Sequence, residues 1–451
     1  MVTEAAALPV TSRWRLHLGW GIGTLGASLL LNGFSYLAPF YLTTVLGISA
    51  ATAAGLLFTA KVWDIFSNPL MGVISDRTES RWGRRRPYLV LGGIVASLAY
   101  MLLFSAGVTP IGDSLVLLGI VAVFVGTGYT IFNVPYMAMP VEMIDDYRER
   151  TRMFSWRVLF IAIGTVIGGA SGQRIAEHFG GGAQGYSTMA VIIGAGIFVF
   201  MAAAFFGTAG SKFTPRARES VPFLEQVRLG LQNGPFAALL AVKFTQLFGL
   251  FTNTATALFV IKFVIGRQDP GTWLLYFGLA SMVAQIATIP AWLRIAARIE
   301  KQKTYLLATA IFVLMSLSWL LANPAEPLWF FLLRAVVKGS ATAGLLLMGQ
   351  SMLPDTIEYD QRRTGLRREG VYSGLYSFVE KVAAALAPSI LLLVYAATGF
   401  ESKAAVQTPA SADGIRIAAA VLPCLYFAAS IPFLFVYRLT EEKLSSTRRA
   451  R

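Results

Sequence analysis

The sequence is poor in the residues that build most catalytic and metal sites. It has 451 residues, with one cysteine and two histidines among them. The single cysteine, Cys424, excludes a disulfide within the chain. One cysteine and two histidines are also too few for an ordinary structural zinc site. His17 and His178 both lie near the ends of apolar runs, so no Ser-His-Asp or Cys-His arrangement is credible. No P-loop sequence occurs either, and an enzyme is the least expected class.

Charged residues are also scarce, at 14% of the chain, whereas 55% of the residues are hydrophobic. A soluble protein of this size could not bury so much apolar surface, so we expect a lipid bilayer around it. The net charge is +14. In a soluble chain this excess would suggest nucleic acid, but here the basic residues lie between apolar runs. We therefore expect no nucleic-acid partner and no obligate protein partner.

Apolar runs long enough to cross a membrane, about 20 residues each, occur twelve times. Backbone in lipid must pair within its own segment, so each run predicts a helix and the fold class is an all-α membrane protein. The N-terminus lacks a signal-peptide pattern, and we expect the first run to be retained. The runs lie near 17–46, 51–75, 87–107, 114–142, 154–176, 187–208, 234–262, 271–293, 304–322, 327–353, 370–397 and 414–437.

Basic residues gather in every second connection, beginning with the N-terminus. The burst "DRTESRWGRRR" after the second run is the strongest example. The opposite side holds only about five basic residues, so the positive-inside rule places both termini in the cytoplasm. The short connections fit a bacterial plasma (inner) membrane.

The longest polar connection, 209–233, divides the chain almost in half. It predicts an N-terminal six-helix bundle over 1–208, a central cytoplasmic linker over 209–233, and a C-terminal six-helix bundle with a short basic tail over 234–451. A weak repeat supports an internal duplication, since "MPVEMIDDYRERT" after the fourth run matches "LPDTIEYDQRRTG" after the tenth.

The repeat pairs Pro140 with Pro354 and Asp146 with Asp360. We expect the charges of these equivalent loops, and of the burst after the second run, to link helix ends during opening and closing. Capping of the loops is the alternative. The predicted network comprises Asp76, Arg84, Glu142, Asp146, Arg150, Asp355, Asp360 and Arg363.

Charges also lie inside the predicted spans, where each costs roughly 2.5–3.5 kcal/mol on insertion scales and is functional by default. Lys61, Asp64 and Asn68 share one face of the helix predicted over 51–75. A carboxylate with an amide one turn away predicts a Na⁺ or H⁺ site, because hard cations prefer oxygen ligands. A buried Lys61–Asp64 pair that only stabilises packing is the alternative.

Polar and aromatic residues follow one face of the helix predicted over 114–142. Tyr129, Asn133 and Tyr136 are spaced by four and three positions, and they could bind a hydroxyl-rich solute or bond neighbouring helices. Tyr376 and Ser377 approach the middle of the span over 370–397.

Three of these motifs, in chain order, resemble the glycoside–pentoside–hexuronide:cation symporters, the melibiose permease-like family of the major facilitator superfamily. They are "WDIFSNPLMGVISDRTESRWGRRRPYL", "YTIFNVPY" with "EMIDDYRERTRMFSWR", and "LPDTIEYDQRRTGLRREGVYSGLYSFVEK". The resemblance covers nearly all of the chain. It implies two pseudo-symmetric six-helix bundles that alternately expose a central site.

The resemblance also implies roles for single residues. Asp64 matches the first acid of a cation site, and Lys381 matches a lysine that joins its charge network. Arg157 matches an arginine near the sugar, and Tyr129 matches a sugar-contacting tyrosine.

The chain departs from the family pattern at four positions. Asn68 stands where the family has a second cation-site acid. Ser28 and Asn133 stand where sugar-gripping aspartates are found, and Met137 replaces a tryptophan. An asparagine cannot titrate, so Na⁺ is favoured over H⁺ as the coupling ion, and the galactoside grip is not carried over.

The expected function is therefore secondary active transport of a glycoside, pentoside or hexuronide, linked to a cation and needing no other cofactor. Arg157 and Lys381 would suit an anionic solute such as a hexuronide. The alternatives are a lysolipid or amphiphile transporter of the same fold, an uncoupled facilitator, and a sensor or scaffold that binds without flux.

Overall fold

A computed structural model describes residues 10–144, 147–209, 230–364 and 369–437, together with three single residues. These are Glu225, Arg228 and Leu439. The described residues are helical, apart from turns and short connections, and contain no strand. They divide into two compact units, one taken from 1–47 and 55–217 and the other from 48–54 and 218–451.

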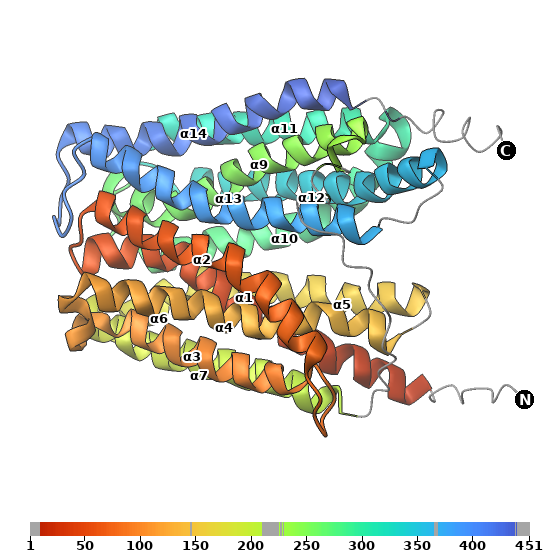
Figure 1. Cartoon of the computed structure of the whole chain (residues 1–451). Coiled ribbons are helices and arrows are strands. Elements are labelled where there is room, and N and C mark those ends of the chain that lie inside the picture. Colours follow the sequence, from red (N-terminus) through yellow and green to blue (C-terminus); the bar gives the residue numbers. More distant parts are fainter. Residues whose placement is uncertain are drawn as a thin grey trace, which may run out of the picture. The chain divides into compact units, whose positions relative to one another are not determined.

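The helices of the first half are α1 (Val10–Phe40), α2 (Ala50–Arg77), α3 (Pro87–Phe104), α4 (Leu115–Met143), α5 (Tyr147–Thr165), α6 (Ser171–His178) and α7 (Gly182–Gly207) (Figure 1). Within this unit α3 packs on both α4 and α7, and α1 packs on α5 and α7. The α1–α7 crossing is close because Gly19 meets Gly207: a Cβ on Gly19 would lie 2.7 Å from the Gly207 Cα. Glycine is the residue that permits such an approach between spanning helices.

The helices of the second half are α9 (Gly234–Phe259), α10 (Pro270–Ile299), α11 (Lys301–Leu317), α12 (Leu328–Thr364), α13 (Glu369–Ala397) and α14 (Pro409–Val436). In this unit α9 packs on α13 and α14, and α12 packs on α10 and α11. Two of the helices begin at a side-chain cap. Asn233 accepts a hydrogen bond from the Phe236 amide at the start of α9, and Thr408 accepts one from the Ser411 amide at the start of α14.

The first helix of each half ends in the same way. α1 continues into a π-helical segment, Tyr41–Val45, and α9 continues into another, Val260–Val264. Each segment is followed by a glycine in the left-handed region, Gly47 with φ 76° and Gly266 with φ 70°. Two equivalent helices with the same uncommon ending are expected from an internal duplication. A third π-helical segment, Val166–Ala170, joins α5 to α6.

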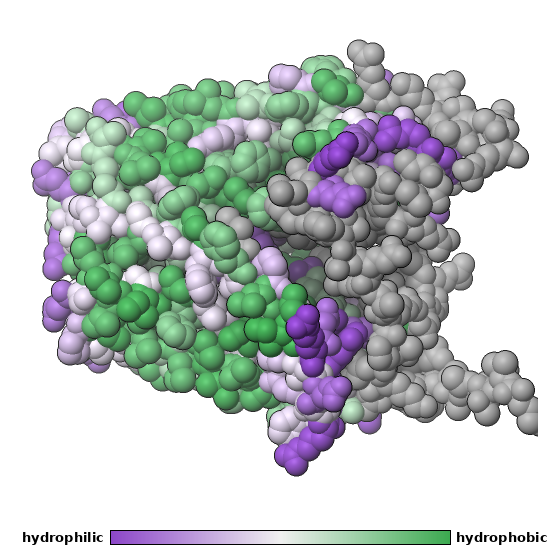
Figure 2. Space-filling model, viewed as in Figure 1, coloured by the Kyte–Doolittle hydropathy of each residue, from purple (hydrophilic) through white to green (hydrophobic). Residues whose placement is uncertain are grey.

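Eleven helices within the described residues are long and apolar enough to span a membrane. They cover eleven of the twelve predicted runs. The remaining run is α2, which carries Lys61 and Asp64 in its middle. Apolar side chains cover the middle of the helices on the face in Figure 2, and hydrophilic ones lie at helix ends. Exposed residues such as Val116 (71%) and Phe206 (70%) suit lipid better than water.

Several helices extend past the predicted runs: α1 begins at Val10 and α5 at Tyr147, and α10 ends at Ile299. The largest difference is at the end of the tenth run. The tenth run was expected to end near 353 and to be followed by a polar turn, but α12 continues to Thr364 with Pro354 inside it. The added turns are held by side chains one turn apart, since Arg362 pairs with Glu358 and Arg363 lies 3.6 Å from Asp360. The corresponding Pro140 also lies inside its helix, α4.

Candidate functional site

Asp64 is a buried carboxylate on α2 that faces α4. It is 7% exposed, and its Oδ2 lies 3.4 Å from the Lys61 Nζ. Its other oxygen, Oδ1, is buried and has no hydrogen-bond partner in the described chain. The backbone of Gly126 on α4 lies against that oxygen, because a Cβ built there would be 2.4 Å from Oδ1. One half of the carboxylate is therefore balanced by a lysine, and the other half remains open for a proton or a small cation.

Polar contacts flank Asp64 along the facing surfaces of α2 and α4. The Trp63 indole donates to the Thr127 hydroxyl at 2.9 Å, and the Ser67 hydroxyl donates to that of Thr130 at 3.4 Å. These contacts hold the two helices side by side on either side of Asp64.

Asn68 lies one turn after Asp64, and its amide nitrogen donates to the Asp64 backbone carbonyl. This bond directs the amide back along α2 and consumes one of its donors. No group of three or more His, Cys, Asp or Glu side chains that could hold a metal ion occurs in the described residues.

The predicted solute residues of the first unit have different environments. The Ser28 hydroxyl donates to the Ile161 carbonyl on α5 at 3.0 Å and accepts from the Asn32 amide at 2.9 Å. Ser28 is therefore occupied in packing α1 on α5. Tyr136 is likewise buried, donates to the Trp20 carbonyl at 2.6 Å, and stacks on its indole with ring centroids 4.6 Å apart.

Tyr129, Asn133 and Arg157 have half-buried side chains. Tyr129 and Asn133 lie one turn apart on α4, and Arg157 lies on α5. The Arg157 Nε is buried without a hydrogen-bond partner among the residues the structure describes. The first unit thus keeps one buried cationic donor that is unsatisfied within the described residues.

The second unit places Lys243 of α9 against α13. Its Nζ lies 3.1 Å from the Glu380 Oε2 and 3.3 Å from the centroid of the Tyr376 ring. Tyr376 is 6% exposed, and its ring lies against the Lys243 ammonium. Lys381 is half-buried on the same helix, and the side chain of Ser377 lies outside the described residues.

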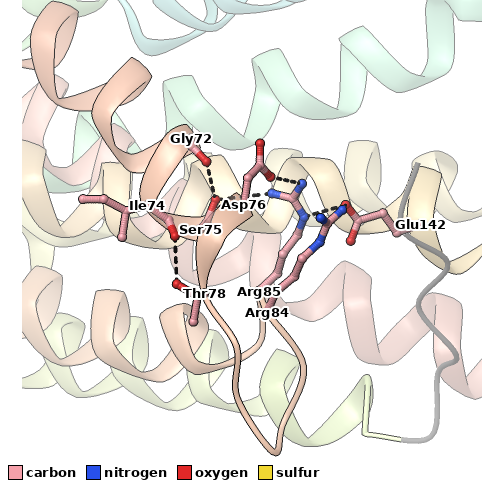
Figure 3. A network of polar contacts seen from close by, with 8 residues as sticks. All are labelled: Gly72, Ile74, Ser75, Asp76, Thr78, Arg84, Arg85 and Glu142. Atoms are coloured by element: carbon pink, nitrogen blue, oxygen red, sulfur yellow. Dashed lines mark hydrogen bonds and ion pairs between the residues drawn. The ribbon is translucent and has the colours of Figure 1, made fainter. Parts of the chain in front are cut away.

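Arg85 is the centre of a charge network at one end of the first unit (Figure 3). Its guanidinium donates to Asp76 at 2.6 Å and to Glu142 at 2.8 Å, and it reaches Ser75 at 3.4 Å. Arg84 adds a second bond to Glu142, at 2.5 Å. The network ties the end of α2 and the start of α3 to the end of α4.

The predicted network residues are thus only partly brought together. Asp76, Arg84 and Glu142 meet through Arg85, which the prediction omitted. In the second unit Asp355 pairs with Lys301 at 2.6 Å, also an omitted residue. Asp360 lies near Arg363, as above, while Asp146 and the side chain of Arg150 lie outside the described residues.

The family described as MFS/sugar transport protein matches residues 19–441. The chain belongs to this family of MFS/sugar transport proteins. The match confirms the family predicted from the motifs, and with it the major facilitator fold. The chain is a multi-pass membrane transporter and not an enzyme.

Relatives of this MFS/sugar transport protein align with it over nearly its whole length. It is 26% identical to the uncharacterized symporter YnaJ of Bacillus subtilis, over 94% of this chain and 92% of that protein. It is 25% identical to the glucuronide carrier protein homolog of Escherichia coli, over 95% and 93%. Among solved structures, a bacterial homolog of the human lysosomal transporter Spinster has a TM-score of 0.67 at 15% identity, over 96% of this chain and 99% of that chain.

Gly126 offers a direct test of the space beside Asp64. We expect Gly126→Ala to crowd the open carboxylate oxygen, because the added Cβ would lie 2.4 Å from it. Solute uptake into liposomes should fall at least tenfold while the folded fraction is unchanged. Gly119→Ala on the same helix is the matched control, since its Cβ would meet Leu56 at an ordinary 3.4 Å. Equal loss in both variants would show that the space beside the Asp64 carboxylate is not specifically needed for uptake.

Proposed function

We propose that this transporter is a symporter that couples the uptake of a sugar-class solute to a cation, with Asp64 as the cation-binding residue. The observation that carries the proposal is the open oxygen of Asp64, buried against Gly126. A buried, half-compensated carboxylate is costly unless it gains a partner, and binding a cation supplies one. Na⁺ is favoured over H⁺ because Asn68, the neighbouring polar group, cannot titrate.

The solute would be bound in part by Tyr129, Asn133 and Arg157. The hydroxyl, amide and guanidinium offer hydrogen bonds to a hydroxyl-rich molecule, and the unsatisfied Nε of Arg157 supports this role. The names of the relatives, a symporter and a glucuronide carrier homolog, agree with a sugar derivative moved together with an ion.

An uncoupled facilitator is a second candidate, and a specific contact favours it. The Lys61 ammonium lies 3.4 Å from the Asp64 carboxylate and on the same helix. A resident cation of this kind could replace the transported one, so that solute movement needs no ion. The two candidates differ in whether a gradient can drive accumulation.

The basic connections support an orientation for this activity. We propose that the arginine network around Arg85 lies at the cytoplasmic surface of a bacterial inner membrane, with both termini on that side. The positive-inside rule supplies the physical reason.

Uptake into liposomes tests the proposed function. Purified protein would be reconstituted and given radiolabelled glycosides, pentoses and uronides, with Na⁺ and pH gradients imposed separately. Symport predicts accumulation above the external concentration under a Na⁺ gradient. Flux that only equilibrates under both gradients would favour the facilitator. If no sugar moves under any condition, the sugar assignment is wrong, and lysolipids become the next solutes to test.

Arg157 is expected to contribute to solute affinity. Arg157→Ala should weaken equilibrium binding of the transported solute by about tenfold or more, as expected for losing a hydrogen bond to a charged group. Arg174→Ala, an exposed arginine on α6, is the control and should bind normally. Equal affinities in both variants would remove Arg157 from the solute site.

A further inference from the structure

The ion pair between Lys243 and Glu380 is unusual because its two members differ in exposure. The Lys243 side chain is 9% exposed and that of Glu380 is 55% exposed. The same unit contains a second ion pair for comparison, between Arg334 of α12 and Glu326 of the connection before it, in which the side chains are 2% and 1% exposed. A pair that only stabilises packing is expected to look like the second, with both charges enclosed.

The exposed side of Glu380 must meet water. Glu380 lies about two turns inside the span Gly374–Ala397. A carboxylate that faced lipid at such a depth would be costly, and ionisable residues within spans face a bundle interior or an aqueous cavity. Oε2 is bonded to Lys243, and no described residue donates to Oε1. The carboxylate therefore presents acceptor positions to a water-filled path.

Lys243 and Tyr376 fix the position of this carboxylate. The Lys243 ammonium lies between the Glu380 carboxylate and the Tyr376 ring, an arrangement that restrains both. Tyr376 is supported in turn from α11 and α12: a Cβ at Gly349 would lie 3.1 Å from both the Tyr376 and the Tyr305 hydroxyls. Contacts from α9, α11 and α12 therefore hold the Glu380 carboxylate in place.

We propose that Glu380 binds the transported solute by accepting hydrogen bonds from its hydroxyl groups, with Lys243 and Tyr376 as positioning residues. This inference rests on the proposed function and assigns a contact of the solute in the second unit. An ionised carboxylate accepts hydrogen bonds and donates none, and it repels other carboxylates. Glu380 therefore selects an uncharged, hydroxyl-bearing part of a sugar over the acid group of a uronide.

Two variants separate this role from a structural one. Glu380→Gln keeps the size of the side chain but removes its charge, and should weaken binding of the best-transported neutral sugar about tenfold or more. It should also raise uptake of the matching uronide relative to that sugar. The double variant Lys243→Glu with Glu380→Lys restores an ion pair with the cation on the exposed side. It should fold, but it should not recover neutral-sugar binding.

The outcomes are distinguishable from failure of the proposed function. Wild-type protein in the same liposomes reports the function itself: no sugar uptake would overturn both proposals. If wild-type takes up sugar, but Glu380→Gln binds it normally, this inference alone is wrong. Recovery of binding in the charge-swapped variant would assign the pair to structure. A wild-type protein that accepts only uronides would also overturn the inference. Asp413→Asn, which removes an exposed acid paired with Arg416 at 2.5 Å, is the control and should bind like wild type.

Discussion

Asp64→Asn is expected to abolish cation-driven accumulation of the solute while downhill flux persists. The substitution keeps the shape of the side chain and removes the negative charge that a cation would bind. Under an imposed Na⁺ gradient, the ratio of internal to external solute should fall to about one. Counterflow exchange should continue, because the solute contacts of α4 and α5 are unchanged. Time courses of uptake in liposomes measure both quantities.

The control for this result is Asp113→Asn, which removes an exposed acid at the connection before α4. It should accumulate solute normally. Lys61→Gln offers the complementary test, since it leaves Asp64 without its resident cation and should tighten Na⁺ binding. Unchanged accumulation in Asp64→Asn would reduce the Lys61–Asp64 pair to a packing contact.

The sequence was sufficient for the helices because lipid imposes a strong constraint on them. Each span must satisfy its own backbone, so a long apolar run has one solution. Helical spacing also placed Lys61 on the same face as Asp64, and the two side chains do form an ion pair. The end of α12 was predicted wrongly because Pro354 and the charges after it are typical of a helix end. The pairs of opposite charges one turn apart that extend the helix are only a weak signal in the sequence.

The parts of the site that the sequence could not predict depend on contacts between distant residues. Arg84 and Arg85 are neighbours of the same type, so the sequence does not distinguish them. Only the fold shows that Arg85 is buried between two acids. Lys243 and Glu380 lie on different helices, 137 positions apart, so no local spacing could pair them. Gly126 carries no side chain to suggest that it borders a carboxylate.

Arg85→Ala is expected to be among the most destabilising substitutions in the charge network. Arg85 is 4% exposed and contacts Asp76 and Glu142, so its removal breaks two ion pairs, one of them with the equally buried Glu142. Removing one partner of a buried ion pair costs about 3–5 kcal/mol when the other charge is left alone. Glu142 keeps its bond to Arg84, so the expected cost is smaller than this, but still above that of a surface pair. α2 depends strongly on this tie, since it has little close backbone packing with the other described helices of its unit. The midpoint of thermal unfolding in detergent should fall markedly.

Arg84→Ala is a matched control one position away. The Arg84 side chain is 24% exposed and pairs with one acid among the described residues, Glu142. Its loss leaves the bond between Glu142 and Arg85 in place. Its effect on the unfolding midpoint should be clearly smaller, nearer to that of a surface pair at roughly 0–1 kcal/mol. If the network also governs opening and closing, Arg85→Ala should change the rate of counterflow at temperatures where the protein is still folded. Equal midpoints for the two variants would show that the burial of Arg85 does not contribute to stability, and that α2 is held by its contacts with α4 around Asp64.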